Sequence, residues 1–287
     1  MNSAQRVIKY FAIALAAVLV LTIFSGILGA ISLAGLFVWG DEVRTSSGEV
    51  TEIWSGCEAE QCLTETVSNV KNLDINIGAT TMRVVEALGN EKVRVETDNE
   101  YVRVWQDGDT LRIVEESHGF FGWWGKTDEL TLYVAPGMEF EKVEIEAGAG
   151  SLVIDKLVAK DLDLELGAGK TVIRSVQAKA TARIEGGAGM LEVQGGVLRN
   201  ADISLGAGKA AVTAQVLGNS KVDSGVGKLE LNLVGSEEDY RLTIDKGLGS
   251  VTANRASLGD KSVWGTGENM IRIDSGVGAV EIKTVTE

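Results

Sequence analysis

Apolar and polar residues alternate with a period of two through the second half of the chain, on both sides of a recurring Gly-x-Gly triplet. When the copies are aligned on their first glycine, the residue three positions earlier is always Ile, Leu or Val, as in Ile145 and Leu164. The positions two and four after the second glycine are mostly apolar too, as in Leu152 and Ile154. This alternation predicts a half-buried strand on each side of every triplet.

The spacing of the triplets predicts stacked coils. They begin at residues 148, 167, 187, 206, 225, 247 and 276, so that successive steps are 19, 20, 19, 19, 22 and 29 residues. A unit of about 20 residues buries no core alone and is stable only in a stack. Each glycine pair supplies a corner where the chain turns tightly or adopts a positive φ. We therefore predict an all-β fold, a single-chain, β-helix-like β-solenoid with coils of about 20 residues and equivalent side chains about 4.8 Å apart.

Less regular segments precede the triplets. Residues 74–80 resemble a degenerate corner, and strand-like runs follow at 82–88, 92–97, 101–106, 111–115 and 130–134. The sequence Gln-Asp-Gly-Asp at 106–109 indicates a tight hairpin. We expect a solenoid ectodomain over 71–287, with an atypical opening part at 71–143 that acts partly as a cap and regular coils at 144–287.

The first forty residues predict a membrane anchor. Residues 10–38 carry no charged side chain and are long enough to span a bilayer as one helix. Arg6 and Lys9 precede this run and Asp41 and Glu42 follow it, and basic residues favour the cytoplasmic side. We therefore expect residues 1–40 to form a cytoplasmic N-terminus and a single transmembrane helix at the cell membrane, with the solenoid extracytoplasmic. A cleaved signal peptide and a re-entrant helix pair are the alternatives.

Residues 41–70 are polar, without a clean period, and are expected to be a linker. They contain the only two cysteines, Cys57 and Cys62, which outside the membrane could form a disulfide or remain free thiols. Their spacing is too wide for the usual metal knuckle, and no second pair exists.

Net charge limits the partners. The chain has 41 acidic and 27 basic residues, and Arg6 and Lys9 lie before the apolar run, so residues 40–287 carry 25 basic and 41 acidic side chains, a net charge of −16. An acidic ectodomain argues against nucleic acid and against adsorption to anionic headgroups. It permits attraction to divalent metals, basic proteins or cationic peptides, although solubility alone would also explain it.

One column of the aligned repeats is acidic. It lies two residues before each triplet and comprises Glu146, Glu165, Glu185, Ser204, Asp223, Asp245 and Asp274. Stacked carboxylates repel one another, so the column predicts either a face balanced by Arg183, Lys221 and Arg272 or a stripe that binds a cation or peptide.

An aromatic loop is the least repeat-like segment. Residues 118–125 contain Phe120, Phe121, Trp123 and Trp124 among three glycines. These rings could cap the open end of the solenoid, or they could anchor a partner or a membrane interface.

No catalytic or cofactor set is expected. The single histidine, His118, completes no Ser-His-Asp or Cys-His arrangement. The triplets lack the third glycine and the following helix of a dinucleotide fingerprint, and Leu191 stands where a calcium-binding repeat needs Asp. We therefore expect no enzyme, no cofactor and no metal site.

The order of segments resembles a known family. A strand ends in Gly-Ala at 78–79, Asp-Gly-Asp-Thr-Leu follows at 107–111 and Leu-Tyr-Val-Ala-Pro at 132–136, and 140–150 leads into the iterated corners. Over about residues 70–287 this is similar to the bacterial envelope family of β-strand-repeat "putative adhesin" domains of unassigned function. The resemblance implies a solenoid outside the membrane and an association with envelope stress, and it supplies no catalytic residues.

Three functions follow as hypotheses. The first is a membrane-anchored binding or sensory module in envelope homeostasis, whose partner is an envelope protein, a cationic peptide or a wall component. The second is an adhesive or self-associating surface protein. The third is an enzyme acting on wall polysaccharide, against which the regular acidic column and the lone His118 count.

Overall fold

The computed structural model describes residues 51–55, 62–63, 69–87, 93–116 and 128–286, and the backbone alone at 51–55 and 62–63. The chain divides into two units at Gly48 and Glu49, and all described residues lie in the second. The strands of this unit are β1 (51–55), β2 (62–63), β3 (72–77), β4 (81–86), β5 (93–97), β6 (102–107), β7 (110–115), β8 (129–134), β9 (140–147), β10 (151–154), β11 (157–166), β12 (170–173), β13 (176–193), β14 (196–199), β15 (201–217), β16 (219–234), β17 (240–253), β18 (256–258), β19 (263–264) and β20 (269–285), with a 3-10 turn at 237–239.

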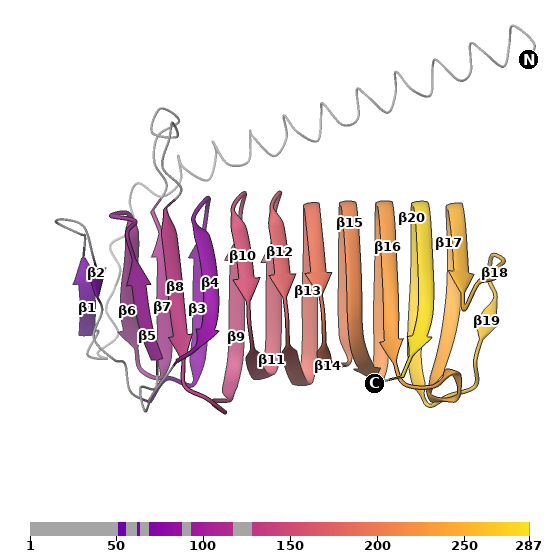
Figure 1. Cartoon of the computed structure of the whole chain (residues 1–287), viewed down its shortest axis with the longest axis horizontal. Coiled ribbons are helices and arrows are strands. Elements are labelled where there is room, and N and C mark those ends of the chain that lie inside the picture. Colours follow the sequence, from indigo (N-terminus) through magenta and orange to yellow (C-terminus); the bar gives the residue numbers. More distant parts are fainter. Residues whose placement is uncertain (1–50, 56–61, 64–68, 88–92, 117–127, 287) are drawn as a thin grey trace, which may run out of the picture. The chain divides into compact units, whose positions relative to one another are not determined.

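The strands form the coils that the repeat predicts, and the β-solenoid expectation is confirmed (Figure 1). In each regular coil the chain rises along one strand, turns at the Gly-x-Gly corner and descends along a second. Thus β9 rises to the corner at Gly148, β10 descends from Ser151, and the first residues of β11 form a short third side. Neighbouring coils pair in parallel and in register, for example Leu164 with Ile145 and Ile184.

The order of coils in the stack differs from their order in the chain. On the rising side it is β6, β7, β3, β9, β11, β13, β15, β16, β20, β17 and β19 (Figure 1). The first regular coil, β3 and β4, therefore lies inside the stack. The last coil, β20, lies between β16 and β17. The two long repeat steps in the sequence, 22 and 29 residues, correspond to this insertion.

Antiparallel segments cover both ends of the stack. Strands β6 and β7 form the expected hairpin through Gly108, whose φ is 62°. At the same end β5 pairs antiparallel with β8, and β1 and β2 extend the sheet from the segment expected to be a linker. At the opposite end β18 and β19 both fold back onto β17. The terminal coils are thus covered at both edges by short strands, which protect the open ladders from pairing with other chains.

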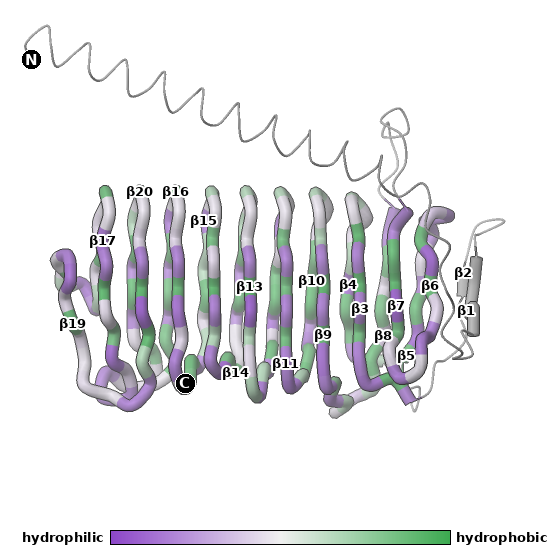
Figure 2. The backbone as a smooth tube through the Cα atoms, turned by 180° about the vertical axis from the view of Figure 1, so that it is seen from behind, coloured by the Kyte–Doolittle hydropathy of each residue, from purple (hydrophilic) through white to green (hydrophobic). Residues whose placement is uncertain are grey.

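The core lies between the rising and descending strands. Hydrophobic and hydrophilic positions alternate along the strands (Figure 2), and the apolar residues of the aligned columns are the buried ones. Ile145, Leu164 and Ile184 have no exposed area, and Ile203 is 1% exposed. Stacked aliphatic side chains in a closed core supply the burial that a single coil lacks.

The corners require glycine because neighbouring coils approach closely there. A methyl group on Gly278, whose φ is +147°, would overlap the carbonyl oxygen of Gly227, and one on Gly167 would overlap that of Gly148. Corner amides donate toward the β3 end of the stack, as from Ala149 to Gly78 (2.7 Å) and from Ala168 to Gly148 (2.9 Å).

The corner at residues 78–80 is the last glycine corner toward the β3 end of the stack, so no further corner accepts hydrogen bonds from its amides. The carboxylate of Glu115, at the end of β7, accepts these bonds instead, from Gly78 N (2.7 Å), Ala79 N (3.1 Å) and Thr80 N (3.3 Å). The buried Asn99 holds this carboxylate from the other side, donating to Glu115 Oε1 (3.3 Å) and to Thr80 Oγ1 (2.8 Å). A side chain thereby closes the row of backbone bonds.

Within the described part of the chain, no helix is long and apolar enough to cross a bilayer. The transmembrane helix expected at residues 1–40 lies outside the described residues.

Candidate functional site

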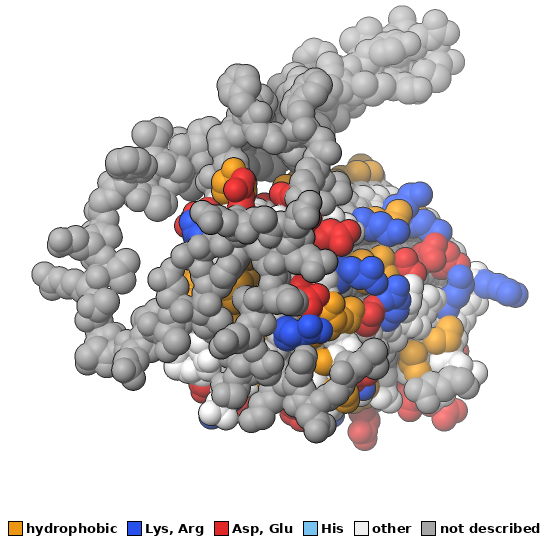
Figure 3. Space-filling model, turned by 60° about the vertical axis from the view of Figure 1, so that its left-hand side comes forward, with side chains coloured by type: hydrophobic (Ala, Val, Ile, Leu, Met, Phe, Trp, Pro, Cys, Tyr) orange, Lys and Arg blue, Asp and Glu red, His pale blue; other side chains and the backbone are white. Residues whose placement is uncertain are grey.

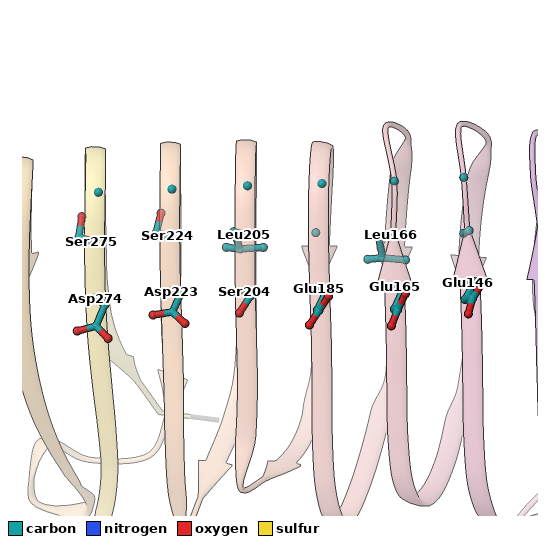
Figure 4. Close-up of a pocket in the computed structure, with 18 of the residues that line it drawn as sticks. Glu146, Glu165, Leu166, Glu185, Ser204, Leu205, Asp223, Ser224, Asp274 and Ser275 are labelled. Carbon is teal, nitrogen blue, oxygen red and sulfur yellow. The ribbon is translucent and has the colours of Figure 1, made fainter. Parts of the chain in front are cut away.

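A shallow groove of about 1120 Å³ runs along the rising strands, directly before the corners. The acidic column forms its floor, and the side chains project from successive strands in one row (Figure 4). The alternation that buries Ile145 and Leu164 sends Glu146 and Glu165 outward, which explains why a regular repeat produces a regular row.

Backbone pairing fixes the order of the row. It runs Asn76, Glu146, Glu165, Glu185, Ser204, Asp223, Asp274, Asp245. We call this row the acidic ladder. The structure thus brings together the acidic residues expected from the sequence. It also adds Asn76, and it exchanges the last two members because β20 lies between β16 and β17.

Cations neutralise the ladder on its β16–β17 side. Lys221 Nζ lies 2.5 Å from Asp223 Oδ2, and the same hydrogen bond raises the pKa of Lys221. Arg272 contacts both neighbours, with Nε 3.1 Å from Asp274 Oδ1 and Nη2 3.6 Å from Asp245 Oδ2. This half therefore matches the balanced face that was one of the two expectations.

The half near β9 is not balanced in this way. Glu146 accepts a hydrogen bond from the neutral Asn76 (2.6 Å), and Glu165 makes no hydrogen bond or ion pair within the described coils. Arg183 bonds Glu185 (2.5 Å) and reaches Asp163 only at 3.9 Å. Carboxylates therefore exceed cations over the first rungs.

A second acidic row lies beside these rungs. Two residues before the ladder, Asp74, Glu144 and Asp163 stand side by side on β3, β9 and β11. Arg112 bonds Asp74 (2.5 Å), and Lys142 bonds Glu144 (2.5 Å). We call Asp74, Glu144, Glu146, Asp163 and Glu165 the acidic patch.

The patch shifts the protonation of its members. Burial raises the pKa of Glu146 above its ordinary value, and the charges of Glu165 and Glu144 raise it further. Burial also raises the pKa of Asp163, while the charge of Arg183 opposes that shift. A raised pKa means that the ionised form of each carboxylate is disfavoured in free energy, and a bound cation would reduce this penalty.

The chemistry available here is electrostatic binding. Among the residues that the structure describes, no group of three or more His, Cys, Asp or Glu side chains is placed to hold a metal ion. Basic and acidic side chains lie next to one another over the face that Figure 3 shows.

Other expected site residues lie outside the description. These are the aromatic residues Phe120, Phe121, Trp123 and Trp124, and also His118 and Cys57. The backbone of Cys62 pairs with Thr97 in β5.

Sequence reasoning missed Asp74, Glu144, Asp163 and the capping carboxylate of Glu115. The first three share the outward alternation of the ladder and could have been found two positions upstream of it. Glu115 carries no such signal in the sequence, because its role depends on the pairing of β7 with β3.

Comparison with solved structures gives distant likenesses. The chain is 14% identical to a putative cell adhesion protein from Clostridium sporogenes, over 79% of this chain and 98% of the other, with a TM-score of 0.35. For a putative adhesin from Bacteroides fragilis the values are 14%, 79% and 98%, with a TM-score of 0.38. For a putative lipid binding protein from Parabacteroides distasonis they are 13%, 79% and 96%, with a TM-score of 0.32. No curated protein matches the chain.

Comparison with protein-family models gives a match that covers most of the chain. The model of the Toastrack DUF4097 family matches residues 66–263, which span the coils from β3 to the start of β19. This confirms the resemblance to a family of adhesin-like solenoids with unassigned function. The chain therefore belongs to the Toastrack DUF4097 family.

Proposed function

We propose that this protein is a non-catalytic binding module, tethered to the cell membrane by its N-terminal apolar segment, that binds a cationic component of the cell envelope through the acidic ladder. Envelope homeostasis is the setting that we propose for it. The partner would be a basic protein, a cationic peptide or a positively charged wall component.

The acidic patch carries this proposal, because two of its carboxylates, Glu146 and Glu165, make no ion pair within the described coils. Five carboxylates stand on adjacent strands at about 4.8 Å spacing. Glu165 makes no ion pair within the described coils, and burial together with the neighbouring carboxylates raises the pKa of Glu146. A flexible peptide with repeated Lys or Arg could place one cation at each rung.

The groove supports an extended ligand rather than a compact one. It follows the ladder from Asn76 to Asp245 and is open to solvent within the described coils. A binding surface of this shape suits a chain-like partner, whose affinity is the sum of several weak contacts. A polysaccharide-cleaving enzyme would instead need one pair of carboxyl groups with distinct roles, one as general acid and the other as nucleophile or base.

Calorimetric titration of the full chain in neutral detergent with an oligolysine peptide tests the proposal. Glu146→Gln/Glu165→Gln removes two charges from the acidic patch. Asp223→Asn/Asp274→Asn removes two from the neutralised half and is the matched control. We expect the first variant to lose about 5- to 30-fold in affinity, since each exposed pair contributes about 0.5–1 kcal/mol, and the control to lose less.

Added salt should weaken binding to the wild-type chain, because exposed charges are screened beyond about 10 Å at 0.1 M. Equal affinity for the two variants would place the ligand elsewhere. Absence of binding by the wild-type chain, or release of sugar from wall polysaccharide, would exclude the function that we propose.

A further inference from the structure

A row of exposed apolar side chains runs along the corner edge of the solenoid. It consists of the middle residues of the triplets, in the stack order Ala149, Ala168, Ala188, Ala207, Val226, Val277, Leu248. We call this row the corner ridge. Val226 is 58%, Val277 50% and Leu248 78% exposed, whereas most Val, Ile and Leu side chains of the coils are buried.

The ridge is straight over the described coils. The corners of successive coils lie in one line along the edge (Figures 1 and 2). Glycines flank each middle residue, so no neighbouring side chain at the corner shields the apolar row. Three adjacent large apolar residues on a solvated edge indicate a contact surface.

Opposite charges line the two flanks of the ridge. The acidic ladder lies on the rising side. On the descending side, Lys170, Lys209 and Lys228 directly follow their triplets and are exposed. Lys228 pairs with Glu230 and Glu281, but Lys170 and Lys209 have no ion pair within the described coils. Glu165 and Lys170 belong to the same coil and lie on opposite flanks of the ridge. Neither makes an ion pair within the described coils.

We propose that two copies of this chain associate ridge to ridge about a two-fold axis parallel to the stack. This rotation keeps each coil at its own level, so Leu248 faces Leu248 and Val277 faces Val277 of the second copy. It also exchanges the flanks. Glu165 of each copy then lies beside Lys170 of the other, and these two unpartnered charges become paired.

The alternatives fit these charges less well. A two-fold axis perpendicular to the stack would bring acidic flank against acidic flank, which is repulsive. A membrane surface with anionic headgroups would attract the lysines but repel the ladder beside them. A second copy in the parallel arrangement instead brings opposite signs together, at Glu165 and Lys170.

The area involved predicts weak association. Seven rungs at about 4.8 Å give a ridge of roughly 30 Å. A strip of this length and one or two side chains in width is well below the ~800 Å² per partner of stable complexes. The dimer would therefore form where chains are concentrated, as on a shared membrane.

Cysteine cross-linking tests the arrangement. The full chain, with Cys57→Ser and Cys62→Ser as background, carries Leu248→Cys and is reconstituted in neutral or anionic vesicles. Mild oxidation should yield a disulfide-linked dimer in both. Val263→Cys on β19 is the matched control, since Val263 is 55% exposed but off the ridge, and it should give only background.

Two further variants probe the geometry in the Leu248→Cys background. Glu165→Lys should lower the dimer yield by about threefold or more, because symmetry places the lost pair twice in the interface. Adding Lys170→Glu should restore the yield, because the flanks are then opposite in sign again. A mixture of Ala149→Cys and Leu248→Cys chains should give no heterodimer, which the perpendicular axis would require.

The proposal is overturned if Leu248→Cys gives no more dimer than Val263→Cys, or if the second charge change fails to restore the yield. Protection of the introduced ridge thiol from a soluble maleimide in anionic vesicles, without dimer, would assign the ridge to lipid instead. Because cross-linking at Leu248 measures no peptide binding, failure of the cation-binding function would leave this result unaffected.

Discussion

Close approach of backbones explains the glycine at position 278. Its φ of +147° is rare for other residues, and the carbonyl oxygen of Gly227 occupies the place of a methyl group. The sequence shows the glycine pair and a turn. It does not show that the space is filled by the next coil, because that depends on stacking.

Gly278→Ala should therefore destabilise the solenoid by about 1–3 kcal/mol, since both the backbone conformation and the packing oppose it. Gly259→Ala is the control, because nothing lies within 4 Å of a methyl group there and its φ is not positive. Urea unfolding followed by circular dichroism measures both. Equal midpoints for the two variants would show that the corner tolerates a side chain.

The raised pKa of Glu146 predicts a pH dependence. A carboxyl group with a higher pKa in the folded state than in the unfolded chain binds protons preferentially when folded. Its favourable contribution is present below the unfolded pKa of about 4.3 and is lost as pH rises through the folded pKa. Glu146→Gln should thus be more stable than wild type near neutral pH, by about 0.5 kcal/mol or less, and the difference should shrink on acidification.

The control for this prediction has the opposite sign. Lys283 lowers the pKa of Glu281, so Glu281→Gln should reduce stability near neutral pH and lose this effect as pH falls. Unfolding midpoints at several pH values measure both differences. A Glu146→Gln chain that is less stable than wild type at neutral pH would contradict the prediction.

At the scale of elements, the strands follow from the alternation of the sequence, and the order of the coils does not. The runs expected at 82–88, 92–97, 101–106, 111–115 and 130–134 correspond to β4 to β8 within two residues at each end. The insertion of β20 between β16 and β17 has no local signal, because every coil offers the same apolar columns to its neighbours. Only the longer steps of the repeat hint at it.

In the candidate site, too, one part follows from the local sequence pattern and another depends on long-range strand pairing. The outward row of Glu146, Glu165 and Glu185 follows from the repeat alone. Its uneven compensation does not, because Asn76 reaches Glu146 only through the pairing of β3 with β9, 70 residues apart in the chain. Long-range pairing therefore decides which carboxylates lack a counter-charge.

For the whole molecule, we expect that an interior coil can be removed without loss of folding, whereas the inserted coil, β20, cannot. Deletion of residues 176–195 joins Ser175 to Gly196, which pairs in register with Val176, so the next coil can take the vacated place. We expect a folded stack that is shorter by one coil. Deletion of residues 269–287 removes the strand with which both β16 and β17 pair, and should unfold the β17 end.

Amide hydrogen exchange distinguishes the two deletions. Protection of β17 should persist in the first and be lost in the second, because exchange reports the opening of each local unit. The prediction fails if β17 keeps its protection without residues 269–287.

The common direction of the corner amides gives the stack an electrical polarity. Peptide groups that point the same way add their dipoles, as they do along a helix, and leave a partial positive charge at the end where N–H groups are exposed. In this molecule that end is the corner at residues 78–80, and the carboxylate of Glu115 sits on its three amides. Glu115 is therefore the counter-ion of a dipole that extends through the row of corners, and a chain without it would present an anion-binding terminus to the solvent.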